Sequence, residues 1–197
     1  SIMARARAKD PEKGYAIDFV SSVLKLNLQQ IANQKIKILS NAGGVNPEAC
    51  AKAIRELVAD LKLDLKVAVV LGDDLMQSKS DFTNIKEMYS EVDFPQEDKI
   101  ASINAYLGAF PIAQALKDGA DIVITGRSVD SAVTLAACIY SFNWNENDYN
   151  KLASGSLAGH IIECGTQSTG GNFTDWELVS KDLHQIGYPI VDIKDSG

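Results

Sequence analysis

The sequence predicts an α/β fold, with a mainly parallel sheet flanked by helices in a Rossmann-like, three-layer arrangement. Two apolar runs, 65–71 and 121–125, are typical of strands that are buried on both faces. They alternate with stretches in which apolar residues recur every three or four positions, as in amphipathic helices. Strands that alternate with helices are joined by right-handed crossovers, and this connection makes the strands parallel.

The first predicted unit runs from helix to strand to helix. Residues 16–34 have helical periodicity, and 36–40 form a short strand. The next helix begins at Asn46, a good N-cap, and is followed by Pro47 at the first helical position.

The second unit repeats this order. Residues 102–117 have helical periodicity, although Pro111 should end or kink that helix. After the strand at 121–125, we expect Ser128 to cap a helix that continues to about Tyr140.

Two segments depart from the pattern. Residues 77–100 are polar and weakly periodic, and we interpret them as a surface insertion or lid. Residues 150–197 combine a helix of small residues with a glycine-rich stretch that we expect to form a hairpin region. The whole chain, 1–197, is therefore expected to be one α/β domain. Its first residues look helical and lack a start methionine, so we expect it to be an incomplete portion of a larger domain.

Composition excludes several classes of protein. A net charge of −7 argues against a general nucleic-acid binder, and no apolar run is long enough to span a membrane. The three cysteines contain no CxxC pair, which fits reduced thiols. We expect a cytoplasmic protein, or one of the mitochondrial matrix if its source is eukaryotic.

Nine ordered motifs cover nearly the whole chain and are interrupted mainly at 77–100. They are residues 1–5, 40–47, 72–75, 104–109, 119–127, 129–132, 155–160, 163–165 and 169–176. In order and spacing they resemble the acyclic terpene utilisation (AtuA) family. Members are associated with bacterial breakdown of citronellol- and geraniol-like terpenes, a route through branched acyl-CoA thioesters that parallels leucine degradation.

The resemblance implies an enzyme of branched acyl-CoA catabolism, of the hydratase, lyase or isomerase class. Its ligand would be a branched acyl-CoA or the related acid. No cofactor is indicated by the sequence, and we expect the protein to form a homo-oligomer. The alternative is a non-catalytic partner or scaffold of an acyl-CoA carboxylase or lyase. A metal-dependent hydrolase is a third reading. The resemblance carries no catalytic residues over to this chain.

Loops after predicted strands carry the candidate ligand-binding residues, because ligands of parallel sheets bind past the carboxyl ends of strands. Asn41, Gly43, Gly44 and Asn46 join a strand to a helix, where free backbone N–H groups and the helix dipole could hold a phosphate or carboxylate. The alternative is an ordinary tight turn.

The next such loop contains Gly126, Arg127 and Ser128. Arg127 suits a phosphate or an acyl carboxylate, because its planar fork donates two hydrogen bonds. The alternative is a structural ion pair of Arg127 with Asp130 or Asp73.

Paired carboxylates, Asp73 and Asp74, end the longer apolar run. They could bind a divalent cation or divide acid and base roles, but one of them could simply cap the next turn. We assign no metal to them.

His160, Glu163 and Cys164 have the spacing that places side chains on one face of a helix. A thiolate nucleophile with an imidazole base is one reading, and three zinc ligands are another. Our candidate catalytic residues are His160, Cys164 and Asp130. The alternative is that Cys164 is a small buried residue at a helix end.

Overall fold

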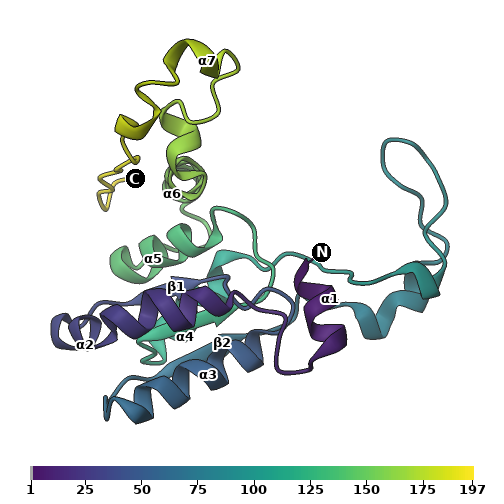
Figure 1. Cartoon of the computed structure of the whole chain (residues 1–197), viewed down its shortest axis with the longest axis horizontal. Helices are drawn as coiled ribbons and strands as arrows, with labels where there is room; N and C mark the ends of the chain where they lie inside the picture. The colour runs from purple at the N-terminus through teal and green to yellow at the C-terminus, as the bar shows by residue number, and fades with distance from the viewer. Residues whose placement is uncertain (1) are drawn as a thin grey trace.

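The computed structural model describes residues 2–197, and it has the predicted α/β architecture. Its three strands form one parallel sheet in the order β1-β3-β2 (Figure 1). The strands are β1 (Ile38–Ser40), β2 (Val67–Val70) and β3 (Ile122–Thr125). Each is shorter than its apolar run, because only the central residues of each run join the ladder.

The central strand β3 connects the two halves of the core. All four of its residues are buried. Ile122 and Ile124 belong to one apolar cluster, and Val123 belongs to the other, as expected when successive side chains point to opposite faces.

Helices cover both faces of the sheet, which confirms the prediction of three layers. The layer on the side of Ile122 contains a π-helical turn η1 (Phe19–Leu24), α2 (Lys25–Gln34) and α3 (Pro47–Asp60). The opposite layer contains α4 (Ala109–Lys117) and α5 (Ala132–Phe142). Within residues 2–197, no helix has both the length and the apolar character needed to cross a bilayer.

The start of α3 confirms the capping prediction. The side-chain oxygen of Asn46 accepts a hydrogen bond from the backbone N–H of Ala49 at 3.4 Å, and Pro47 is the first helical residue. Proline costs nothing there, because the first N–H groups of a helix have no partner within it.

The prediction of one helix over 102–117 is wrong for its first half. Helix α4 begins only at Ala109, and Pro111 is its third residue, where the missing N–H breaks no helical bond. The preceding residues are held by loops at the sheet edge instead. Ile103 accepts a hydrogen bond from the N–H of Leu75 at 2.9 Å, and Leu107 donates one to the carbonyl of Arg127 at 3.0 Å.

Ser128 does not cap α5, so that prediction is also wrong. It pairs with Leu107 in an isolated parallel bridge, and α5 starts four residues later with Ser131 at the N-cap position. The loop continues past Ser128 because its backbone is pulled into pairing with the segment before α4: the N–H of Val129 donates to the carbonyl of Leu107 at 3.0 Å.

The two irregular segments lie outside the sheet. Residues 77–100 project from the body on the side of α1 (Ile2–Lys9) and contain η2 (Met76–Phe82) and η3 (Glu97–Lys99) (Figure 1). Helix α6 (Tyr149–Glu163) packs on α5. The glycine-rich stretch that follows forms helical turns rather than the expected hairpin, namely η4 (Gly165–Thr169), α7 (Trp176–Val179) and η5 (Leu183–Gln185).

A buried tryptophan connects the end of the chain to the core. Trp144 is 2% exposed, stacks on Phe142 at 5.4 Å between ring centroids, and donates its indole N–H to the carbonyl of Asp195 at 3.0 Å. A buried indole N–H needs such an acceptor.

Glycine allows α6 to approach α5 closely. A Cβ atom at Gly159 would lie 2.8 Å from the backbone oxygen of Ser131 and 2.9 Å from its Cα. Contact with backbone atoms cannot be relieved by rotating a side chain, so the distance between α6 and the start of α5 depends on this glycine.

Replacing Gly159 with Ala should therefore destabilise the protein by about 1–3 kcal/mol through overpacking. At an exposed helix position the same change would stabilise by up to about 1 kcal/mol. Urea unfolding followed by circular dichroism measures the loss. The matched control is Leu157→Ala on the same helix, where the side chain is 64% exposed and the change should stay within about 0.5 kcal/mol. A Gly159→Ala protein as stable as wild type would contradict the close packing.

Candidate functional site

A buried carboxylate joins the ends of β2 and β3. Asp73 is 3% exposed, and its Oδ2 accepts hydrogen bonds from the backbone N–H of Arg127 at 2.7 Å and from the side-chain amide of Asn104 at 2.9 Å. Its backbone carbonyl accepts a third from the N–H of Ala105 at 2.9 Å. Three segments that are distant in sequence are therefore held together at the carboxyl edge of the sheet.

Gly126 makes room for this carboxylate. A Cβ atom at Gly126 would overlap the carboxylate of Asp73. Gly126 was predicted to bind a ligand, but its lack of a side chain is needed to make space for the carboxylate of Asp73.

The two adjacent carboxylates have separate environments. Asp74 is exposed, pairs with Arg7 at 3.3 Å, and accepts a hydrogen bond from the backbone N–H of Met76 at 3.0 Å. Because Asp73 is held by its own donors and Asp74 by Arg7 and Met76, the two carboxylates do not converge on one point.

Arg127 keeps its guanidinium available. Its Nη2 donates to the hydroxyl of Tyr106 at 2.8 Å, and its guanidinium carbon lies 4.9 Å from the centroid of that ring. Within residues 2–197 it forms no ion pair. Neither alternative ion pair, with Asp73 or with Asp130, is present, because it is the backbone of Arg127 that contacts Asp73.

The loop after β1 uses most of its N–H groups internally. The N–H of Gly44 donates to the carbonyl of Asn41 at 3.1 Å, and that of Val45 donates to the carbonyl of Gly14 at 2.9 Å. Gly44 has a φ of 57°, and a Cβ there would overlap the sulfur of Met3. These contacts give no support to an anion held by free N–H groups of this loop.

Asn46 and Gly43 are structural parts of the same loop. The Asn46 side chain is 9% exposed and donates to the carbonyls of Pro11 at 2.7 Å and Lys13 at 2.8 Å, in addition to capping α3. A Cβ at Gly43 would overlap the carbonyl oxygen of Thr125, so this glycine allows the loop to cross the end of β3.

Ser128, next to Arg127 in the same loop, has a buried hydroxyl group. The side chain is 3% exposed, and its Oγ has no hydrogen-bond partner among the described residues. A buried hydroxyl without a partner costs about 1–3 kcal/mol, so it is a local source of instability next to Arg127.

A cleft follows the carboxyl edge of the sheet. Three adjoining depressions of about 510, 350 and 310 Å³ share residues at this edge, and the largest has mostly apolar walls. Helix α1 forms one side, and residues 101–106 form the other. The walls of the first two depressions include Met3, Ala4, Arg7, Val45, Met76 and Arg127.

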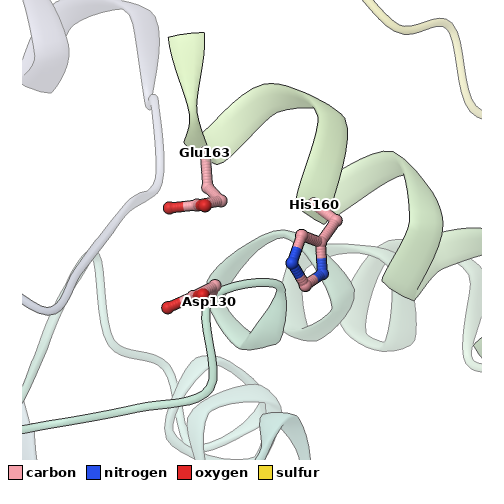
Figure 2. Close-up of side chains that lie close together, drawn as sticks. All are labelled: Asp130, His160 and Glu163. Carbon is pink, nitrogen blue, oxygen red and sulfur yellow. The ribbon is translucent and has the colours of Figure 1, made fainter. Parts of the chain in front are cut away.

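The candidate catalytic residues are absent from the walls of this cleft. His160, Glu163 and Asp130 are exposed, and their ligand atoms lie within 4.8 Å of one another (Figure 2). Asp130 is three residues beyond Arg127 on the loop between β3 and α5. The prediction that His160 and Glu163 share a helix face is confirmed.

Cys164 differs from the expected nucleophile. Its thiol donates a hydrogen bond to Glu163 Oε1 at 2.7 Å. This bond, with a small contribution from burial and the negative charges of Glu163 and Asp130, raises the pKa of the Cys164 thiol. A reactive cysteine needs the opposite environment. Cys50 and Cys138 are buried, and burial raises the pKa of Cys50 to about 12.

Arg7, Asn104 and Tyr106 line the cleft, but the sequence did not single them out as candidate site residues. They reach the site from α1 and from the segment before α4. The resemblance motifs included Asn104 and Tyr106, so those motifs were the available signal. No spacing pattern could have placed Arg7 there, because α1 reaches the sheet edge only through tertiary contacts.

Removal of the buried carboxylate should be costly. In Asp73→Ala, the N–H of Arg127 and the amide of Asn104 lose their acceptor, and we expect a loss of about 2–4 kcal/mol in the free energy of unfolding. Urea unfolding provides the measurement. Asp74→Ala is the matched control, with an expected loss below about 1 kcal/mol because its ion pair is exposed. Equal losses for the two variants would contradict the role of Asp73.

Alkylation should report the environment of Cys164. Replacing Glu163 with Gln removes the negative charge that disfavours the thiolate, so Cys164 should react with iodoacetamide at least about twofold faster at pH 8. Peptide mass spectrometry in the presence of a chelator measures the rate. Cys50, buried in the same protein, serves as the unreactive internal control. A slower reaction of Cys164 in Glu163→Gln would show that the carboxylate does not suppress the thiolate.

Comparison with known proteins adds an identification to this geometry. The model of the acyclic terpene utilisation family protein AtuA matches residues 1–197, including the insertion at 77–100 that interrupts the motifs. No curated protein and no solved structure matches the chain. Because the match covers the entire length, the chain belongs to the acyclic terpene utilisation (AtuA) family.

Proposed function

We propose that the cleft binds a branched acyl-CoA or the related branched acid, and that the protein is an enzyme of branched acyl-CoA catabolism. The reaction would be a hydration, lyase or isomerase step. Family membership supports the terpene context. The acyl ligand and the reaction class are what the family resemblance implies, and the chemistry of the cleft is compatible with such a ligand.

The walls of the cleft suit such a ligand. Ala4, Ala8, Val45 and Met76 give the largest depression an apolar lining, which a branched hydrocarbon chain can bury. The volume of about 510 Å³ lies in the range of small-molecule sites.

The free guanidinium of Arg127 is the observation that carries the proposal. It reaches the cleft next to Tyr106, and no carboxylate of the described residues neutralises it. A cation without a partner on a protein of net charge −7 is a local binding group for an anion. A phosphate of coenzyme A or the carboxylate of an acid would supply that anion.

Proton transfer is assigned to Asp130 and His160. Hydration, elimination and isomerisation of a thioester all require a group that takes up and returns a proton, and a carboxylate beside an imidazole provides one. Asp130 shares its loop with Arg127, and Arg127 lines the cleft. We assign no nucleophilic role to Cys164, because its neighbours keep the thiol protonated.

Calorimetric titration of the full-length protein with isovaleryl-CoA tests the proposal. Coenzyme A alone and isovalerate alone distinguish recognition of the nucleotide part from recognition of the acyl part. Arg127→Ala should weaken binding by roughly tenfold to a hundredfold, since it removes hydrogen bonds from a charged donor.

Arg5→Ala is the matched control. Arg5 lies on α1, the helix that forms one side of the cleft, but it does not line the depressions. Its replacement by Ala removes the same positive charge as Arg127→Ala. Its affinity should stay within about twofold of wild type, because exposed charges act weakly at a distance. An absence of binding to any branched acyl-CoA, or equal losses in both variants, would reject the proposal.

A second function is favoured by exposed apolar side chains on both irregular segments. Met88 and Tyr89 on the insertion are 76% and 85% exposed, and Leu178 and Ile190 near the end of the chain are 83% and 94% exposed. Exposed apolar groups of this size suit a protein partner. The alternative is therefore a non-catalytic partner of an acyl-CoA carboxylase or lyase.

Co-purification with such an enzyme separates the two functions when it is combined with activity measurements. If the partner complex keeps wild-type activity in both His160→Ala and Arg127→Ala, the chain acts as a scaffold. If either variant loses activity while the complex remains intact, the catalytic proposal holds.

A further inference from the structure

One cluster of polar side chains combines two carboxylates with an imidazole. His160 and Glu163 are one helical turn apart on α6, so both project from the same face. Asp130 reaches the same place from the loop that precedes α5. Figure 2 shows the carboxylates of Asp130 and Glu163 lying one above the other, with the imidazole of His160 beside Asp130. One ligand atom of each lies within 4.8 Å of the others.

Tertiary packing holds the two elements in this arrangement. Gly159, directly before His160, rests against the backbone of Ser131, directly after Asp130. This contact is too close for any larger residue. The contact between Gly159 and Ser131 therefore fixes the distance between α6 and the loop, next to His160 on one side and Asp130 on the other. A preorganised ligand site requires such a fixed backbone.

The cluster has no compensating cation of its own. In the described part of the chain no Lys or Arg forms an ion pair with Asp130 or Glu163. Among residues 2–197, the hydrogen bond to these carboxylates comes from the weakly donating thiol of Cys164. Two neighbouring carboxylates repel each other, and a bound cation relieves that repulsion.

We propose that Asp130, His160 and Glu163 form a three-ligand site for a divalent metal ion, with zinc as the best fit. Zinc accepts imidazole nitrogen and carboxylate oxygen together, whereas magnesium and calcium favour oxygen alone. Three protein ligands leave a coordination position open for water or substrate. Zinc–ligand distances are about 2.0–2.2 Å, so the exposed side chains close by rotation around the ion.

The site goes beyond the proposed acyl ligand, since it requires only the ion. While an ion is bound, Asp130 and His160 are its ligands, so the proton transfer proposed for them belongs to the metal-free protein. The site also gives the shared loop a second function. Arg127 at the start of this loop faces the cleft, and Asp130 at its end would hold the metal. An ion bound here would tether α6, through His160 and Glu163, to the loop, through Asp130.

Metal titration of the full chain tests the proposal. The protein is stripped with a chelator and titrated with Zn²⁺ by calorimetry, and with Co²⁺ by visible absorption, which reports the coordination geometry. We expect one ion per chain. His160→Ala and Glu163→Gln should each lower the affinity by more than about tenfold. Both side chains are exposed, and circular dichroism verifies that the variants fold.

Matched controls separate this site from other ligands. His184→Ala removes the only other histidine and should bind Zn²⁺ like wild type. Cys164→Ser removes the partly exposed thiol and should also retain binding. The proposal is overturned if the chain takes up no stoichiometric ion, or if His160→Ala binds normally while Cys164→Ser or His184→Ala does not. Neither outcome bears on acyl-CoA binding, which calorimetry measures in the presence of the chelator.

Discussion

The carboxylate of Asp73 is the interaction on which the sheet edge depends. A buried charge is tolerated only when donors surround it, and here they come from a neighbouring strand end and from the segment before α4. The bond to the Arg127 backbone has a further effect. It fixes where the loop after β3 begins and leaves the guanidinium free to face the cleft. Gly126 is part of the same arrangement, because any side chain there would displace the acid.

Local sequence signals predicted the core well and the edge less well. The apolar run that became β3 is buried on both faces, and Asn46 caps α3, because these features depend on nearest neighbours along the chain. The run that became β2 was expected to be buried in the same way, but β2 is an edge strand and three of its four residues are only half-buried. The start of α4 could not be predicted, since Leu107 bonds to a loop twenty residues away. In the glycine loop, the spacing suggested free N–H groups, but Gly44 and Val45 donate theirs within the protein. Glycine pattern alone does not reveal whether a loop encloses a ligand or its own backbone.

The sequence located the loops and the helix face of the candidate site, but it did not show which residue has which role. Asp130 and His160 were chosen separately and prove to be neighbours, whereas Cys164 is held as a thiol by Glu163. Arg7 and the rest of α1 enter the cleft from the beginning of the chain, and that contribution depends entirely on tertiary packing. The cleft and the metal-ligand cluster are consequently two separate places served by one loop.

The strand order has a consequence for how the chain acquires its structure. β1 and β2 never touch, because β3 lies between them. During synthesis, neither of the first two strands can form its native ladder until residue 125 has left the ribosome. The apolar faces of α2 and α3 also cannot be fully buried before then, since Ile122 and Ile124 complete the core between them. Such long-range parallel pairing folds slowly, and the nascent chain depends on its helices for early order.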